Sequence, residues 1–168
     1  MGTITNLHAA RPIDDVDARA AQLFALARTH LEDLPPLQRL EYAIGALEQA
    51  SGGLLYLADS QPPNDTQLNL GWLATQTIMA AGTAAPRDAD LIQDGVERAR
   101  RMLEGSDVDD AFDAIAGALQ EATAALMFLM DLADAGSRQW LSSLACEIAT
   151  VASDTTYAAA SRPLAVAA

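Results

Sequence analysis

The 168-residue sequence has no lysine, one cysteine and two histidines. Without lysine it holds neither a Schiff-base nucleophile nor the phosphate-binding lysine of a P-loop. The single cysteine, Cys146, excludes an intrachain disulfide, and so few cysteines and histidines exclude a tetrahedral zinc site built from them. The longest uninterrupted apolar run spans residues 124–130 and is too short to cross a bilayer. We therefore expect no membrane span and no cofactor.

Positive charge is also scarce. The formal net charge is −13, the isoelectric point is about 4.2, and all ten basic residues are arginine. Such a field repels nucleic acid and anionic lipid, so neither a nucleic-acid nor a membrane partner is expected. Thirty-six alanines, three asparagines and no lysine indicate a GC-rich bacterial genome.

The first residues, Met1 to Asn6, have neither the basic nor the apolar segment of a secretory signal. Together with the single cysteine, this predicts a reducing cytoplasmic location. The last residues, 162–168, end in Ala-Ala and are similar to degradation tags read by bacterial unfoldase proteases. An alanine-rich tail that follows from codon usage is the simpler interpretation.

Alanine and leucine number 59, whereas valine and isoleucine together number twelve. This balance favours helix over strand, and spacings of three and four replace period-two alternation. The sequence predicts an all-α, antiparallel bundle of about six helices with no β-sheet. We expect a flexible N-terminal arm over 1–12, one helical domain over 13–161 and a flexible tail over 162–168.

The clearest helix is expected over 107–135, ended by Gly136. Its apolar positions step by alternating fours and threes and form one seam: Val108, Phe112, Ile115, Leu119, Ala122, Leu126, Leu129 and Ala133. Small alanines flank this seam, so a neighbouring helix can approach closely. Such a seam builds either an intramolecular bundle or a homo-oligomer.

Five further helices are expected over 14–30, 37–61, 64–82, 88–103 and from 137 onward. Asn64 with Gln67 indicates a capping box at the start of the third helix. Gly52-Gly53 interrupts the second, and this pair marks either a kink or a close approach by another backbone. A break there would give seven helices.

Asp109, Asp110 and Asp113 spell DDxxD, which resembles the aspartate-rich pattern of class I terpene synthases and prenyltransferases. The resemblance covers five residues and implies carboxylates that hold Mg²⁺ against a diphosphate. The second metal-binding motif of those enzymes is absent. The simpler interpretation is an acidic first turn that compensates the helix dipole.

Other candidates have equally plain interpretations. His30 is expected at a helix C-terminus, where the dipole favours it, and Cys146 is expected as a small core residue. Arg98, Arg100 and Arg101 form a basic patch that either docks a carboxylate or offsets nearby acidic groups. The sequence identifies no catalytic, cofactor-binding or metal site.

Four aromatic residues and their neighbours are the expected walls of any ligand pocket: Tyr42, Tyr56, Trp72 and Trp140, with Thr75, Gln76 and Thr77 as polar groups. The seam over 107–135, its alanine flanks and the lack of a catalytic set make a non-enzymatic protein–protein interaction or regulatory module the first hypothesis. Its partner would be another protein or a second copy of this chain. The second is a bundle that binds a small apolar ligand, with or without enzymatic activity. The remote third is Mg-dependent diphosphate chemistry at the DDxxD-like segment.

Overall fold

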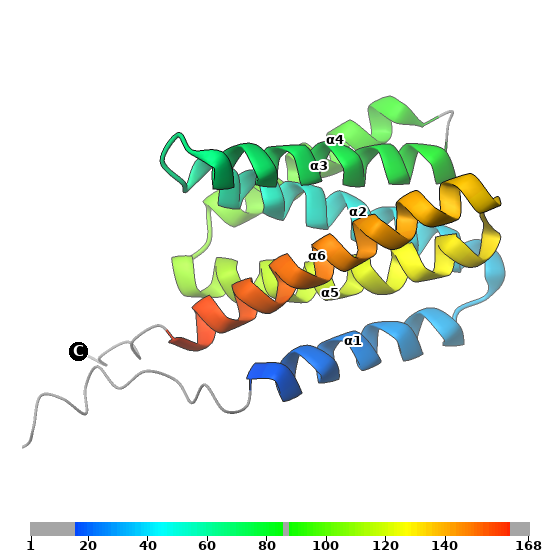
Figure 1. Ribbon diagram of the computed structural model, residues 1–168, viewed down its shortest axis with the longest axis horizontal. Coiled ribbons are helices and arrows are strands. Elements are labelled where there is room, and N and C mark those ends of the chain that lie inside the picture. Colours follow the sequence, from blue (N-terminus) through cyan, green and yellow to red (C-terminus); the bar gives the residue numbers. More distant parts are fainter. Residues whose placement is uncertain (1–15, 86–87, 162–168) are drawn as a thin grey trace, which may run out of the picture.

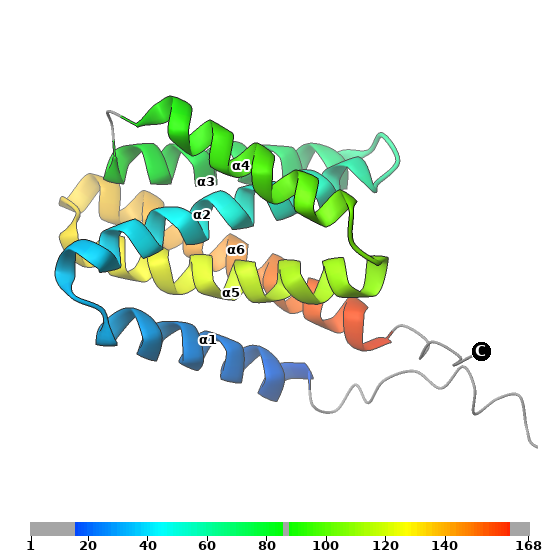
Figure 2. The same ribbon diagram turned by 180° about the vertical axis from the view of Figure 1, so that it is seen from behind.

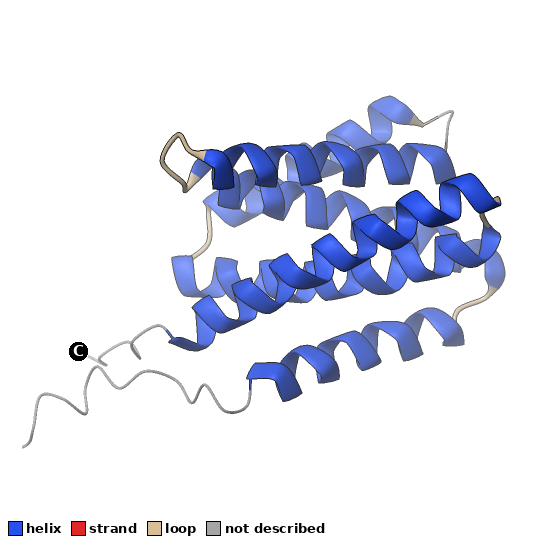
Figure 3. Ribbon diagram, viewed as in Figure 1, coloured by secondary structure: helices blue, strands red, loops and turns tan. Residues whose placement is uncertain are grey.

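The computed structural model describes residues 16–85 and 88–161, and every regular element in these ranges is an α-helix (Figure 3). The predicted all-α bundle is confirmed, with six helices. They are α1 (Val16–Asp33), α2 (Pro36–Asp59), α3 (Asp65–Ala84), α4 (Ala89–Glu104), α5 (Val108–Leu132) and α6 (Ala135–Ser161).

α2 and α5 are the central helices and pack against each other (Figure 1). α3 and α4 cover the side of α2 that faces away from α5, while α6 packs along α5. α1 lies on the opposite side of the molecule from α3 and α4, against α5 and α6 (Figure 2). Sequential neighbours are therefore not always packing neighbours, because α1 chiefly contacts α5 and α4 chiefly contacts α2.

The predicted seam of α5 lies in the core. Ile115, Leu119, Leu126 and Leu129 are buried, and α2, α6 and α1 cover them. Only the first turn is open, with Val108 48% exposed. Because the bundle itself uses this seam, α5 offers no long apolar face to a partner.

Gly52 and Gly53 lie inside a continuous helix, so α2 is not broken. A Cβ atom at Gly52 would lie 2.8 Å from the Ala99 Cβ and 2.9 Å from the Val96 carbonyl oxygen, both on α4. A Cβ at Gly53 would meet the Ile115 side chain of α5 at 3.2 Å. The pair marks close approach on two sides, which settles the choice that the sequence left open.

The predicted boundary between the last two helices is wrong by a few residues. α5 ends at Leu132, not at 135, and α6 begins at Ala135, so Gly136 lies in its first turn. Asp134 causes the difference, because its carboxylate accepts a 2.8 Å hydrogen bond from the Ser137 backbone N–H. Hydrogen bonds from the backbone and side chain of Ser137, and from the Gly136 backbone, hold the pKa of Asp134 below its usual range.

The other helix ends lie within three residues of their predicted positions where the structure describes them. α1 continues to Asp33 rather than ending at His30. The predicted arm 1–12, the start of the first helix at Asp14 and the tail 162–168 with its Ala-Ala end lie outside the described residues.

One helix of the described chain, α5, is long and apolar enough to span a bilayer by length and composition. Its most apolar window is 56% buried within the bundle, as in the core helix of a water-soluble protein.

Candidate functional site

α3 turns an apolar seam towards the solvent. Leu68 is 70% exposed, and Trp72 and Met79 are each 53% exposed. With Thr75 they step by four, three and four residues, which places all four on one side of the helix. We call the surface made by Leu68, Gly71, Trp72, Thr75, Met79 and Gly82 the α3 outer face.

The same helix carries almost no charge. No Asp, Glu, Arg, Lys or His occurs between Asp65 and Arg87, in a chain whose net charge is −13. A solvent-facing helix ordinarily bears charged residues on its outer side. Interface centres differ from ordinary surface in this way, because they are depleted of charge and enriched in tryptophan and methionine.

Polar groups on the α3 outer face are already satisfied within the helix. The Thr75 hydroxyl donates to the Gly71 carbonyl at 3.1 Å, and the neighbouring Thr83 hydroxyl donates to the Met79 carbonyl at 3.0 Å. An apolar partner therefore leaves neither hydroxyl proton without an acceptor.

The two glycines of this face have no internal role in packing. A Cβ atom at Gly71 or at Gly82 would meet nothing within 4 Å. At Gly52, in contrast, α4 occupies the space that a Cβ atom would take. Gly71 thus leaves open space next to Trp72, and Gly82 leaves it one turn beyond Met79, so another backbone can approach closely at both places.

α3 is held firmly from behind. Its inner face buries Leu70, Leu73 and Ala74 against the core, and the buried Ser51 hydroxyl of α2 donates to the Ala74 carbonyl at 3.2 Å. At its start, the Asn64 side chain accepts from the Gln67 N–H at 3.0 Å, which confirms the predicted N-cap.

A side-chain bridge ties α3 to α6 as well. The Trp140 indole N–H donates to the Gln76 amide oxygen at 2.9 Å, and both residues are half-buried. Gln76 and Trp140 were expected as pocket groups. They instead form a hydrogen bond between the two helices, which limits rotation of α3 about its own axis and so helps to orient Trp72.

Open grooves lie elsewhere on the described part of the molecule. One, of about 370 Å³, lies between α1, α2 and α5 and is lined by Phe24, Leu31, Met127 and Phe128, with Arg28 and Arg39 among its polar lining residues. Two smaller grooves, of about 250 and 230 Å³, include Leu132 and Met102 respectively. None of the four aromatic residues expected as pocket walls lines any of these grooves.

Tyr42 belongs to a polar cluster between α1, α2 and α5. Its ring meets that of His30 edge to face, with centroids 4.9 Å apart, and its hydroxyl is hydrogen-bonded to Glu121. Burial, the negative charge of Glu121 and this hydrogen bond raise the pKa of Tyr42 to about 12. Burial also raises the pKa of Glu121, while His30 and Tyr42 partly oppose that shift. The cluster joins three helices through paired groups.

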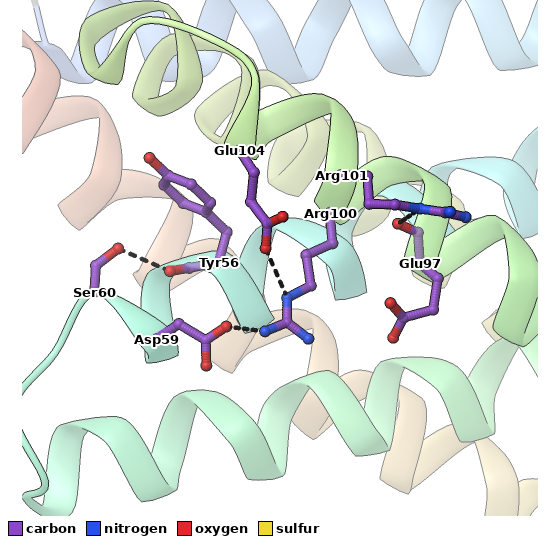
Figure 4. A network of polar contacts seen from close by, with 7 residues as sticks. All are labelled: Tyr56, Asp59, Ser60, Glu97, Arg100, Arg101 and Glu104. Carbon is purple, nitrogen blue, oxygen red and sulfur yellow. Dashed lines mark hydrogen bonds and ion pairs between the residues drawn. The ribbon is translucent and has the colours of Figure 1, made fainter.

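The three arginines of α4 interact with different groups and do not form one basic patch. Arg100 reaches Asp59 at the end of α2, and its Nε lies 3.5 Å from Glu104 (Figure 4). The Arg101 Nε donates to the Glu97 carbonyl at 3.3 Å. Burial raises the pKa of Glu48, and the charge of Arg98 partly opposes that shift. Arg100 therefore ties α4 to α2 through the Asp59 carboxylate.

Asp109 and Asp110 of the DDxxD resemblance lie in the first turn of α5, and Asp113 lies in the second. The Asp107 carboxylate caps the first turn by accepting from the Asp109 N–H at 3.0 Å. In the described ranges, no three His, Cys, Asp or Glu side chains come together in a way that could hold a metal. The magnesium hypothesis gains no support from this arrangement.

Cys146 is exposed, so the prediction that it is a core residue is wrong. α6 buries Leu144, Ala145 and Ile148, and a residue at position 146 lies on the far side of the helix from them. Its place next to the apolar residues in sequence hid this rotation.

No family model, curated protein or solved structure matches this chain at a significant level. Function is therefore inferred from the surfaces themselves.

Proposed function

We propose that this protein is a non-enzymatic protein–protein interaction module, and that the α3 outer face is its contact surface. The observation that carries the proposal is an exposed apolar seam, Leu68, Trp72 and Met79, on a helix without charge after Asp65. Trp and Met are enriched at interface centres, and a large aromatic often supplies most of the binding energy.

The partner that suits this surface is an uncharged, apolar helix. The seam is straight, has satisfied hydroxyls and is flanked by Gly71 and Gly82, which together favour helix against helix. It offers no cation for a nucleic-acid phosphate or an anionic lipid headgroup. As the sequence suggests, the proposal includes a cytoplasmic setting without nucleic-acid or membrane binding.

A second candidate function follows from the groove between α1, α2 and α5. Its volume of about 370 Å³ falls within the usual range for small-molecule sites, and Phe24, Leu31, Met127 and Phe128 supply apolar walls. Arg39 is committed to the end of α1, since it donates to the carbonyls of Glu32 and Leu34, each at 2.6 Å. A small, mainly apolar molecule is the ligand class that this groove favours.

Native mass spectrometry separates the two candidates. We expect masses at integer multiples of 17.7 kDa, or at one chain plus a second protein, and no small-molecule excess. An excess of a few hundred daltons that disappears on denaturation would support the ligand-binding function instead.

Affinity purification from the source cells extends the test to unlike partners. The bait is compared with Leu68→Glu, on the α3 outer face, and with Leu91→Glu, which lies on α4 and is 65% exposed. A partner that binds the bait and Leu91→Glu but not Leu68→Glu, and that re-forms the complex from purified components, supports the proposal. Absence of any self-association and of any such partner would overturn it.

A further inference from the structure

The residues of the seam on the α3 outer face have the same spacing in both chain directions. Its steps from Leu68 through Trp72 and Thr75 to Met79 are four, three and four residues. When a second copy lies antiparallel, Leu68 comes opposite Met79 and Trp72 opposite Thr75 of that copy. These are the mixed layers by which two antiparallel helices interlock, and a two-fold axis between the helices produces every layer twice.

The charge of the molecule also favours a second copy at this place. Each chain carries −13, so two copies that meet on acidic surface repel each other. α4, the other helix that covers α2, presents seven ionisable residues, whereas α3 presents none after Asp65. The α3 outer face is therefore a place where two copies can touch without burying like charges.

Packing geometry is consistent with a helix–helix contact. Gly71 and Gly82 lie on the same edge of the seam, eleven residues apart, and a Cβ at either would meet nothing within 4 Å, so a facing backbone can approach closely along this edge. The bridge from Trp140 to Gln76 and the Ser51 hydrogen bond keep α3 from rotating when it is pressed by a partner.

From these observations we infer that the protein forms a two-fold homodimer through antiparallel pairing of α3 with α3 of a second copy. The inference rests on the proposed function and names the partner. The seam spans about 16 Å of helix, so the contact is at the small end of the range for specific interfaces, and the dimer is in reversible exchange with monomer.

Sedimentation velocity tests this dimer with a matched pair of variants. The wild-type chain is run from about 1 µM to about 300 µM, the range in which an interface of this size dissociates. We expect its weight-average mass to rise from 17.7 kDa towards twice that value. Leu68→Glu should weaken the dimer at least about tenfold, whereas Leu91→Glu, an equally exposed leucine of α4, should dimerise as wild type does.

Ionic strength provides a second readout. Raising it from about 0.01 M to about 0.15 M shortens the Debye length from about 30 Å to about 8 Å. Two chains of −13 then repel less, so the homodimer should tighten as salt is added. Contacts made by opposite charges would weaken under the same change.

Cysteine pairing tests the direction of the two helices. Chains with Leu68→Cys and with Met79→Cys, both in a Cys146→Ser background and one carrying a tag, are oxidised separately and together. Antiparallel pairing predicts a disulfide mainly between the two different chains. Disulfides mainly within each separate preparation would indicate parallel helices and overturn the inferred geometry.

The outcomes divide cleanly between the inference and the proposed function. A wild-type chain that stays monomeric at every concentration and salt overturns the homodimer, and leaves the interaction module to be judged by the affinity purification. If Leu68→Glu and Leu91→Glu weaken the dimer equally, the α3 outer face is the contact surface neither of the homodimer nor of the proposed interaction module. Circular dichroism of each variant confirms that the helices are intact.

Discussion

α3 and α4 both cover α2, yet they turn opposite kinds of surface to the solvent. α4 is short and strongly amphipathic, carries charged residues such as Asp94 and Arg98, and buries only Ile92, Gly95 and Val96. α3 is longer, uncharged after its first residue, and apolar on both its inner and its outer side.

The two helices differ in the surface that each leaves exposed to the solvent. α4 completes its packing at Gly52, where its backbone contacts α2. Its remaining surface carries seven ionisable residues beside two exposed apolar side chains, Leu91 and Met102. α3 completes its inner packing equally well but leaves a second apolar side in water. An exposed apolar patch on a helix whose other side is buried in the core is typical of a surface that another protein covers.

The largest effect that we expect comes from filling the α2–α4 contact. Gly52→Ala places a methyl 2.8 Å from the Ala99 Cβ and 2.9 Å from two backbone atoms of α4, so the helices must separate. The free energy of unfolding in urea should fall by about 1–3 kcal/mol.

Gly71→Ala is the matched control on α3. Its methyl meets nothing within 4 Å, so the substitution should raise the free energy of unfolding by up to about 1 kcal/mol through helix propensity. If both variants change stability alike, the contrast between the two helices in closeness of packing is wrong.

The helix starts provide the next test. The Asn64 side chain caps α3, so Asn64→Ala should lower the free energy of unfolding by about 1 kcal/mol. Asp88, at the start of α4, makes no side-chain capping bond, and Asp88→Ala should cost only a few tenths of a kcal/mol through the helix dipole. Thermal unfolding of both variants, followed by circular dichroism, checks the ranking. Equal losses would show that the Asn64 hydrogen bond contributes nothing.

The charged surface of α4 should contribute little to stability. Arg100→Met removes the ion pairs with Asp59 and Glu104, whose side chains are 54% and 55% exposed. We expect a loss of less than about 1 kcal/mol, smaller still in high salt. A double-mutant cycle with Asp59→Asn measures the coupling, and a coupling well above 1 kcal/mol would show that this surface holds α4 in place.

The smallest effect concerns Glu48, which lies over Gly95 of α4. Burial raises the pKa of this carboxyl, and Arg98 only partly opposes the shift. A raised pKa in the folded state means that the protonated form is the more stabilising one. Its contribution is complete below the unfolded pKa and is lost as the pH rises through the folded value.

Glu48→Gln should therefore raise the free energy of unfolding at about pH 7 and change it little at about pH 4, where the carboxyl is largely protonated. Urea unfolding at both pH values measures this. Glu41→Gln, at an exposed position of the same helix, is the control and should stay within about 0.5 kcal/mol of wild type at both. A gain at about pH 4 as large as at about pH 7 would contradict the assigned cause.

Much of the fold was predictable, because helix periodicity survives wherever one side of a helix is apolar and the other polar. The seam of α5 had this form, and its spacing predicted the helix but left open whether the seam faced the bundle or a second copy. The structure places it in the core. The end of α5 was misplaced because Gly136 is a plausible helix terminator, whereas the cap that determines the boundary is the side chain of Asp134.

The α3 outer face was harder to find from the sequence. Leu70 and Leu73 point inward while Leu68 and Trp72 point outward, so apolar residues surround the helix and no single stripe stands out. A signal was nevertheless present, namely the run without charge from residue 66 to residue 86. No prediction from the sequence rested on this signal, and a lack of charge alone does not say which side of the helix faces the solvent.

The close contact at Gly52 also has an evolutionary consequence. Every other amino acid adds at least a Cβ atom, and that atom would press on the α4 backbone, so no substitution at this site is neutral. In relatives of this chain, Gly52 should stay fixed while Gly71, which touches nothing, drifts. A lineage in which Gly71 is also fixed would indicate selection by a partner, at a glycine that the packing of this chain does not require.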